Sequence, residues 1–202
     1  MINTIETGSN PNNKKQAVFV SIYTETPIWR NYHEISEENR TTIVPLVLML
    51  QRWDGKIGFI GGNVDGDESL KEAVIREVKE EAGFDVPAML LTQMSLICSH
   101  ETNKNVTHLM GLKVSEEIFR SILVNNHKAE HFLSEGTLFS VQMINYPHKP
   151  SFDNFMQNNF APTVKEEIYE FVKELDWLSK YNLNISDPLI HQETKRKTII
   201  KK

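Results

Sequence analysis

Three glutamates, Glu77, Glu80 and Glu81, are spaced so that a helix would carry their carboxylates on one face. Residues three and four positions apart are neighbours on a helix surface, and like charges there destabilise the helix by roughly 0.2–0.5 kcal/mol per pair. A chain that keeps three carboxylates together therefore favours a bound cation. All-oxygen ligands suit Mg2+ or Mn2+ better than zinc. The alternative is a solvated acidic face with Arg76 and Lys79 as salt-bridge partners.

The surrounding residues predict the helix that must position these carboxylates. Apolar residues recur at intervals of four, as in an amphipathic helix, at Leu70, Val74 and Val78. A glycine-rich loop precedes this helix, and either Asp67 or Ser69 is suited to be its N-cap. Gly83 is suited to end the helix, because glycine adopts a positive φ without a steric cost. The glutamates are thus expected on the later turns of a capped helix.

Residues 62–84 read GNVDGDESLKEAVIREVKEEAGF and contain the complete pattern G-x5-E-x7-R-E-U-x-E-E-x-G-U, where U is apolar. Its fixed positions are Gly62, Glu68, Arg76, Glu77, Glu80, Glu81 and Gly83. At residue frequencies of roughly 6% per fixed type, a chance match in this chain is below about one in a million. The pattern resembles a Nudix box, the signature of hydrolases that cleave nucleoside diphosphates linked to another group. The resemblance implies metal-dependent cleavage of a phosphoanhydride bond.

The composition of the 202 residues, with 40% hydrophobic and 24% charged, is typical of a soluble globular domain with appendages. No apolar run of transmembrane length and no signal-peptide pattern is seen, and Cys98 is the only cysteine. We therefore expect a cytoplasmic protein with no membrane association and a buried, inert thiol. The net charge of −5 argues against a surface that is basic throughout. A local basic tail suggests a solvated terminus or, alternatively, an RNA contact: Lys195, Arg196, Lys197, Lys201 and Lys202.

Composition and periodicity divide the chain into a flexible segment (1–14), a folded domain (15–182) and a C-terminal tail (183–202) that is basic at its end. The Nudix resemblance implies that the folded domain is a hydrolase domain. Strands are predicted at 17–25, 42–51, 56–60, 88–100 (as a strand or bent strand pair), 106–114 and 137–145. Besides the box helix, helices are predicted at 116–125, at 153–159 as a short helix or turn, and from a Thr163 cap to about residue 181. The polar loop from Thr26 to Arg40 carries aromatic residues that could flank a base or pack peripherally. This pattern predicts an α+β fold or a three-layer α/β/α sandwich, and the Nudix resemblance implies the sandwich with a mixed sheet.

Other catalytic motifs are absent from the sequence: it has no P-loop, no G-x-S-x-G elbow, no H-E-x-x-H and no paired cysteines. His100 stands at the end of a predicted strand, where a hydrogen-bonded structural role is favoured over a catalytic one. Glu135, in a loop before Gly136, is either a further acidic group at the metal site or an ordinary loop residue.

Beyond the box, the chain resembles the Nudix branch of the small nucleolar RNA decapping enzymes, which are also inosine diphosphatases. The resemblance covers roughly Ala17 to Leu175 and includes LMLQRWDGKIGFIGGNVDGDESL, the Cys98-Ser99-His100 run, FRSIL and FDNFMQNNFAPTVKEEI. It implies metal binding by Glu77, Glu80, Glu81 and Gly61, an ion pair between Glu68 and Arg76, and close backbone approach at Gly61 and Gly62. It also implies a nucleotide pocket that includes Arg52 and Phe59, and a homodimer.

The chain departs from that branch at positions that contact the base. A histidine of the branch corresponds to Phe19, which can stack but cannot hydrogen-bond. A glutamine corresponds to Glu167, which only accepts hydrogen bonds when it is ionised. An aromatic residue and a proline beside the paired glycines correspond to Asn63 and Ile60. We therefore expect a purine substrate, with Glu167 favouring a base that presents N–H groups, such as guanine.

The expected function is hydrolysis of purine nucleoside di- or triphosphates of the IDP or GDP kind, and of the 5′ ends of capped RNA. Glu80, Glu81 and Glu135 are the candidates for the general base, and Glu77 completes the catalytic set. ADP-ribose or a dinucleotide is the alternative substrate, because the box predicts the bond type and not the leaving group. A non-catalytic RNA-binding module is the alternative from another class.

Overall fold

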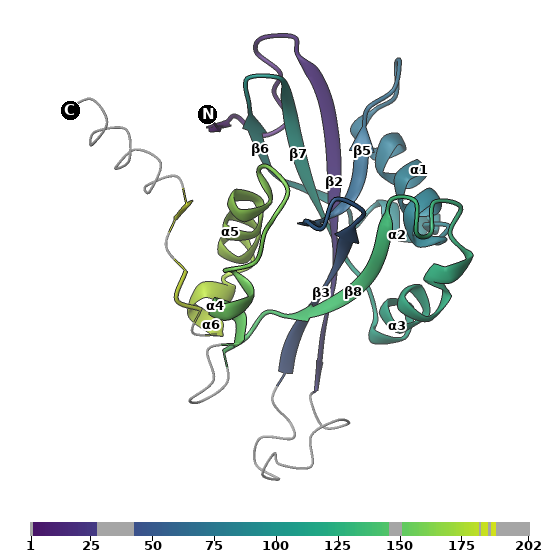
Figure 1. Cartoon of the computed structure of the whole chain (residues 1–202), viewed down its shortest axis with the longest axis vertical. Coiled ribbons are helices and arrows are strands. Elements are labelled where there is room, and N and C mark those ends of the chain that lie inside the picture. The colour runs from purple at the N-terminus through teal and green to yellow at the C-terminus, as the bar shows by residue number, and fades with distance from the viewer. Residues whose placement is uncertain (1, 28–42, 146–150, 182, 186, 189–202) are drawn as a thin grey trace, which may run out of the picture.

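Figure 1 shows the computed structural model of the chain, in which residues 2–27, 43–145, 151–181, 183–185 and 187–188 are described. The aromatic residues of the predicted polar loop, Trp29, Tyr32 and His33, lie outside the described residues. The basic residues of the C-terminal tail also lie outside them. Neither expectation is tested by the structure.

A mixed eight-stranded sheet forms the centre of the molecule, with strand order β1-β6-β7-β2-β3-β4. Strand β5 pairs with β2 and strand β8 pairs with β3, outside that order. Strands β2 and β7 run parallel, and the other pairs are antiparallel. The strands are β1 Asn3–Ile5, β2 Lys15–Pro27, β3 Ile43–Arg52, β4 Ile57–Gly58, β5 Ile60–Asn63, β6 Ser95–Glu101, β7 Asn105–Lys113 and β8 Gly136–Gln142.

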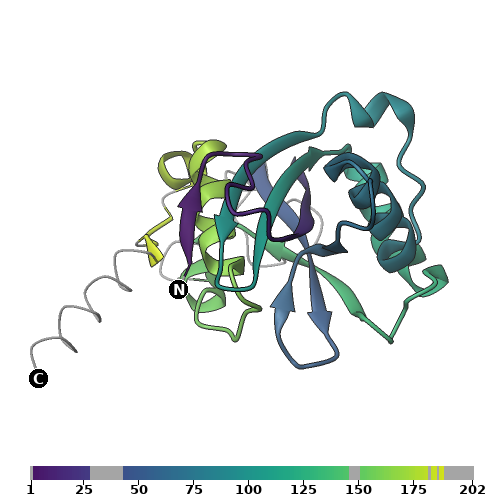
Figure 2. The same ribbon diagram turned by 90° about the horizontal axis from the view of Figure 1, so that it is seen from above.

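Helices cover both faces of this sheet, as Figures 1 and 2 show. Their bounds are α1 Leu70–Ala82, α2 Ala88–Leu91, α3 Glu116–Asn125, α4 Ser151–Phe155, α5 Val164–Glu174 and α6 Trp177–Lys180. A 3-10 turn, η2 Asn126–Lys128, follows α3. None of the described helices combines the length and apolar character needed to cross a membrane.

The two faces of the sheet bury two separate hydrophobic cores, because side chains alternate along each strand. On β2, Val18 and Val20 pack in the core beneath α1 and α3, whereas Phe19 and Tyr23 pack in the core beneath α5 and α6. The predicted α/β/α sandwich with a mixed sheet is therefore confirmed.

Part of the segment predicted as flexible (1–14) forms a strand that the sequence does not predict. Strand β1 pairs antiparallel with β6, in register from Asn3 with Glu101 to Ile5 with Ser99. The Gly8 N–H donates to the Ser99 hydroxyl at 2.9 Å. A three-residue edge strand has too few residues to show a period in sequence, so the pairing was not predictable from pattern.

Other element boundaries differ as well, and two of these differences change the elements themselves. Ala88–Leu91 is the helix α2, with only Ser95–Glu101 in strand β6, because a short apolar run does not distinguish a helix from a strand. The predicted helix from Thr163 is divided into α5 and α6, since Asp176 between them has φ 55°. The Thr163 side chain makes no capping hydrogen bond to the helix backbone.

Candidate active site

Helix α1 carries the three glutamates and is capped at both ends by neighbouring residues. The Ser69 hydroxyl accepts from the Glu72 N–H, and the Glu72 carboxylate accepts from the Ser69 N–H at 2.8 Å, which makes a reciprocal capping box. Gly83 ends the helix with φ 65° and donates its N–H to Lys79 O at 3.0 Å. Of the two predicted caps, Ser69 is therefore the one used.

Strand β5 brings two glycines against this helix. A Cβ atom at Gly62 would lie 2.4 Å from Glu77 Oε1, so the carboxylate occupies the space that any other residue would fill. A Cβ at Gly61, where φ is 141°, would lie 2.2 Å from the carbonyl oxygen of Val18. The Gly61 N–H donates to Glu81 Oε2 at 2.8 Å. The close backbone approach expected at both glycines is therefore present.

Arg76 holds the acidic side chains of the box together. Its Nε and Nη2 donate to the two oxygens of Glu68 at 2.9 Å and 3.1 Å, a bidentate pair that keeps the pKa of Glu68 below its usual range. Its Nη1 donates to Glu77 Oε1 at 2.7 Å and to Glu80 Oε2 at 3.3 Å. Its Nη2 also donates to the carbonyl oxygen of Asn63 at 2.9 Å. Arg76 thus links the entry loop to the carboxylates.

The carboxylates differ in their exposure to water. The side chains of Glu77 and Glu80 are 11% and 26% exposed, and Glu81 is 6% exposed. Burial raises the pKa of Glu77 against the opposing charge of Arg76. Burial also raises the pKa of Glu81 to about 8, and the nearby charges of Glu77 and Glu135 add to this effect. Negative charge is thus crowded and poorly hydrated at this end of α1.

The donor set fits a hard divalent cation in its chemistry, since it consists of carboxylate oxygens. Among the described residues, however, no three acidic, histidine or cysteine side chains are arranged around one common point. The positive charge beside these carboxylates comes from Arg76, whose Nη1 contacts both Glu77 and Glu80. Cation binding would require the Arg76 Nη1 contacts to change.

The segment from η2 to β8 donates hydrogen bonds to the backbone of the same helix turn. The His131 N–H donates to the carbonyl oxygen of Glu80 at 2.8 Å, and its Nδ1 lies 3.9 Å from Glu80 Oε2. The buried Asn126 donates its side-chain amide to the carbonyl oxygen of Glu81 at 2.8 Å. No spacing or motif in the sequence marks His131 or Asn126, which approach α1 only through the fold.

The predicted substrate-binding residues, together with Glu135 as a predicted catalytic residue, fall into two groups. The charges of Arg52 and Glu135 reach Glu81, and Phe19 lies against Gly61, where a Cβ atom would be 3.0 Å from Phe19 Cδ1. Arg52 and Glu135 therefore lie near the carboxylates, whereas the Phe19 ring packs on the other face of the sheet, against the core beneath α5 and α6. Phe59 is only 2% exposed and Glu167 is fully buried, so both belong to the core beneath α5 in this structure.

Two further residues named from the sequence are buried. Cys98 is 4% exposed, as expected for an inert thiol, and burial raises its pKa. His100 is fully buried on β6, and neither ring nitrogen has a hydrogen-bond partner among the described residues. Burial lowers the pKa of His100 to about 4, so the ring is neutral at physiological pH. The hydrogen-bonded role expected for His100 is not seen.

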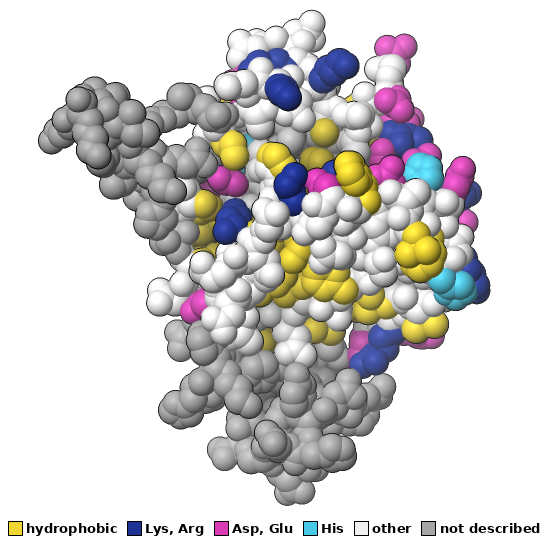
Figure 3. All heavy atoms as spheres, in the orientation of Figure 1, with side chains coloured by type: hydrophobic (Ala, Val, Ile, Leu, Met, Phe, Trp, Pro, Cys, Tyr) yellow, Lys and Arg dark blue, Asp and Glu magenta, His cyan; other side chains and the backbone are white. Residues whose placement is uncertain are grey.

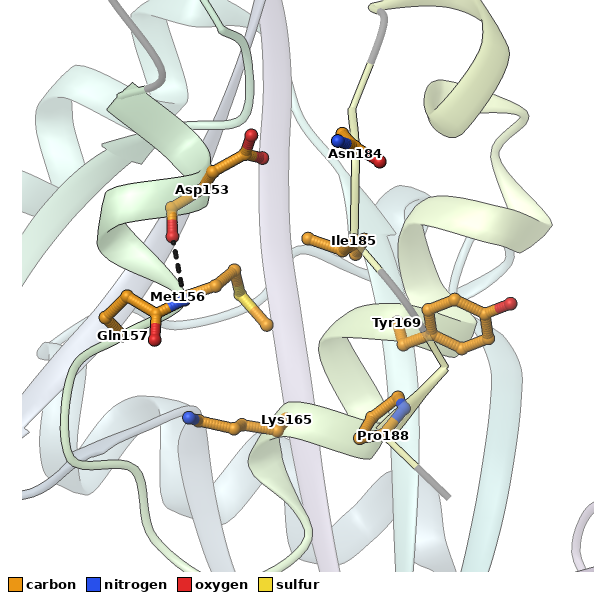
Figure 4. Close-up of a pocket in the computed structure, with 8 residues that line it drawn as sticks. All are labelled: Asp153, Met156, Gln157, Lys165, Tyr169, Asn184, Ile185 and Pro188. Carbon is orange, nitrogen blue, oxygen red and sulfur yellow. Dashed lines mark hydrogen bonds between the residues drawn. The ribbon is translucent and has the colours of Figure 1, made fainter. Parts of the chain in front are cut away.

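The surface view in Figure 3 shows acidic side chains gathered toward the side of α1 and β5, with histidine and basic side chains among them. A cavity of about 300 Å3 lies elsewhere, at α4 and α5 (Figure 4). It is lined by Asp153, Met156, Gln157, Lys165, Tyr169, Asn184, Ile185 and Pro188. None of these residues belongs to the box, so this cavity is separate from the carboxylate site.

The sandwich fold and the complete box on α1 together define a Nudix hydrolase. A family model described as Nudt16-like, U8 snoRNA-decapping enzyme-like, matches residues 16–178, and the chain belongs to this family. The U8 snoRNA-decapping enzyme of Xenopus laevis is 31% identical over 148 residues, covering 69% of this chain and 69% of that protein. The human Tudor-interacting repair regulator protein is 28% identical over 143 residues, covering 68% of this chain and 66% of that protein.

Solved structures of low sequence identity share the fold. A mutT/nudix family protein from Listeria innocua superposes with a TM-score of 0.54 at 13% identity, covering 83% of this chain and 96% of that chain. The Bacillus subtilis pyrophosphohydrolase BsRppH superposes with a TM-score of 0.51 at 16% identity, covering 87% and 89%. These two similarities support the architecture alone.

Proposed function

We propose that this Nudix hydrolase uses Mg2+ or Mn2+ to cleave the phosphoanhydride bond of purine nucleoside di- or triphosphates and of RNA 5′ caps. The proposal rests on the complete carboxylate set on α1. The Glu77 carboxylate packs beside Gly62, and the Glu81 carboxylate accepts a hydrogen bond from the Gly61 N–H. The decapping enzymes among its relatives support RNA caps as substrates.

Glu77, Glu80 and Glu81 would hold the ion, and Gly61, the fourth ligand that the Nudix resemblance implies, would contribute its carbonyl oxygen. When bound, the ion supplies positive charge to the diphosphate oxygens and makes a neighbouring water more acidic. Arg76 would then give up its Nη1 contacts to Glu77 and Glu80. It would keep its pair with Glu68, which it makes through Nε and Nη2.

Glu80 is our candidate for the group that takes the proton from the attacking water. Of the two carboxylates that accept from Arg76 Nη1, that of Glu80 is the more exposed, and its backbone carbonyl accepts from the His131 N–H. Glu81 is oriented by the Gly61 N–H and is buried, which suits a ligand better than a group that exchanges protons with solvent. Glu135, whose charge reaches Glu81, is the second candidate base.

Glu167 is proposed to bias the choice of base. Its Oε1 accepts from the Thr163 hydroxyl at 2.9 Å, and its Oε2 is buried with no hydrogen-bond partner among the residues that the structure describes. An unsatisfied carboxylate oxygen is an acceptor for an N–H group, which guanine presents more fully than hypoxanthine. Base binding at Glu167 requires opening of the core beneath α5, since the residue is fully buried.

Product release from a substrate panel tests the proposed function. The panel contains IDP, GDP, ADP-ribose, a dinucleoside polyphosphate and a short capped RNA, each with Mg2+, with Mn2+ or with EDTA. We expect metal-dependent cleavage of the purine diphosphates and the capped RNA. Cleavage of ADP-ribose or the dinucleotide alone would instead support the other substrate classes, and no cleavage of any compound would refute the proposal.

A further inference from the structure

Two large apolar side chains are exposed on neighbouring loops beside the carboxylate site. Trp53, in the turn between β3 and β4, is 70% exposed, and Leu133, in the loop before β8, is 68% exposed. The Trp53 N–H donates to the carbonyl oxygen of Glu135 at 3.2 Å, which joins the two loops. Next to this bond, Arg52 pairs with Gly136 in the ladder between β3 and β8.

Both loops are fixed to the carboxylate site through hydrogen bonds and charge. The His131 N–H bonds to the backbone of Glu80, and Glu135 N–H donates to the carbonyl oxygen of His131 at 3.1 Å. The other loop begins after Arg52, the last residue of β3, and the positive charge of Arg52 acts to lower the pKa of Glu81. Trp53 and Leu133 therefore stand on the rim of the site and not on an unrelated surface.

The turn that presents Trp53 is held rigidly. Arg52 N–H donates to Lys56 O at 2.9 Å, and Gly55 N–H donates to Arg52 O at 3.0 Å. The Asp54 carboxylate accepts from Lys56 N–H at 3.2 Å and from Arg52 Nε at 3.3 Å. Because the backbone of the turn is already ordered, ligand binding at Trp53 costs little backbone entropy.

Leu133 is held in a conformation that bulky residues rarely adopt, with φ 69°. Its N–H donates to the carbonyl oxygen of Gly136 at 3.2 Å, which closes the loop. Gly136 is required there, because a Cβ atom would lie 2.3 Å from the carbonyl oxygen of Gln51. Backbone conformations of this kind cost about 1–3 kcal/mol and occur preferentially at functional sites.

We propose that Trp53, with Leu133 beside it, is a stacking platform for the RNA base adjacent to the nucleotide that is cleaved. Single-stranded RNA is bound by exposed aromatic rings next to positive charge, because every base has a face that can stack. The same turn carries two cationic side chains, Arg52 and Lys56, which are 30% and 38% exposed and share the single carboxylate of Asp54. The inference rests on the proposed function and adds an RNA-binding element to it.

A comparison of two substrates tests this platform. The ratio of kcat/KM for a capped RNA of several nucleotides over kcat/KM for GDP is measured for the native enzyme, Trp53→Ala and Trp53→Phe. Loss of one stacked base corresponds to roughly a 5- to 100-fold effect, so Trp53→Ala should lower the ratio by that factor. Trp53→Phe should restore most of it. Met89→Ala, at a residue that is 72% exposed on α2, is the matched control and should leave the ratio unchanged.

Binding without catalysis separates this inference from the proposed function. Quenching of tryptophan fluorescence by a single-stranded RNA oligonucleotide, in EDTA, should be seen in the native protein and lost in Trp53→Phe. This readout applies even if the enzyme cleaves none of the panel substrates. An unchanged ratio for Trp53→Ala together with unchanged quenching for Trp53→Phe would overturn the platform. Conversion of a dimer into a monomer by Trp53→Ala, with RNA affinity unchanged, would also overturn it and assign the patch to a protein interface.

Discussion

The carboxylates of the box differ in their surroundings. Glu68 makes a bidentate ion pair with Arg76. Glu81 is buried and accepts from the Gly61 N–H, whereas Glu80 is partly exposed to water. Identical residue types therefore become a structural group, a ligand candidate and a base candidate.

Replacement of Glu80 by Gln tests the assignment of the base. Glu80→Gln keeps the size and polarity of the side chain but cannot accept a proton, so turnover should fall by at least about a hundredfold. Glu72→Gln, on the same helix, keeps the capping box and should retain native turnover. If Glu80→Gln keeps its activity in saturating metal while Glu135→Gln loses it, the base is Glu135.

Glu167 provides a test of base preference. In the native enzyme, GDP should be cleaved more efficiently than IDP, and Glu167→Gln should reduce that preference. The measurement is kcat/KM for both nucleotides with both proteins. A strong IDP preference in the native enzyme that Glu167→Gln leaves unaffected would contradict the role of this carboxylate.

Glu167 should also make stability depend on pH. Burial raises its pKa to about 7 in the folded protein, against the opposing effect of the Thr163 and Thr107 hydroxyls, whereas the ordinary value is 4.5. The folded state therefore holds a proton that the unfolded state releases, and the free energy of unfolding should fall as pH rises from 4.5 to 7. Denaturant titrations across that range should show a shallower fall for Glu167→Gln. Identical slopes for the two proteins would contradict a raised pKa.

At the scale of elements, the site depends on how closely β5 approaches α1. Gly62→Ala would place a methyl group where Glu77 Oε1 now lies, so the carboxylate must move. We expect turnover to fall by at least about tenfold, since displacement of about 1 Å can cost that much or more. Gly66→Ala is the control, because φ there is 52° but a Cβ meets nothing within 4 Å. It should lower stability through backbone strain and leave turnover near native.

The packing of α6 against the sheet depends on a partly buried carboxylate. Glu25 on β2 accepts from Lys180 Nζ at 2.6 Å, from Tyr181 OH at 2.7 Å and from Lys113 Nζ at 2.7 Å, which lowers its pKa to about 2. Its contribution is present above the unfolded pKa and is lost as pH falls from about 4.5 toward 2. Glu25→Gln should therefore lower stability at neutral pH and reduce the loss on acidification, as measured by thermal unfolding.

At the scale of the whole molecule, local sequence predicted the features that are encoded locally. The Ser69 cap, the Gly83 end and the carboxylate face of α1 follow from spacing within one helix, and the sandwich follows from the order of elements. Contacts made by distant segments had no such signal. Three such contacts depend on tertiary pairing: strand β1 with β6, the hydrogen bonds of His131 and Asn126 to α1, and the hydrogen bond between Trp53 and Glu135.

The burial of Phe59 and Glu167 shows a second limit of prediction from sequence. Both positions are predicted substrate contacts because they match positions of related enzymes, and a match in sequence carries no information about exposure. In this structure both are closed within the core beneath α5. Their role in binding a base stays a prediction.

The most direct test of the account is the rate of GDP hydrolysis as Mg2+ is titrated, for the native protein and for a variant with Glu77→Gln, Glu80→Gln and Glu81→Gln together. The native rate should be negligible in EDTA and rise to saturation with Mg2+, whereas the triple variant should stay inactive at every concentration. Equal hydrolysis by the two proteins, or undiminished native hydrolysis in EDTA, would contradict a metal-dependent reaction at these carboxylates.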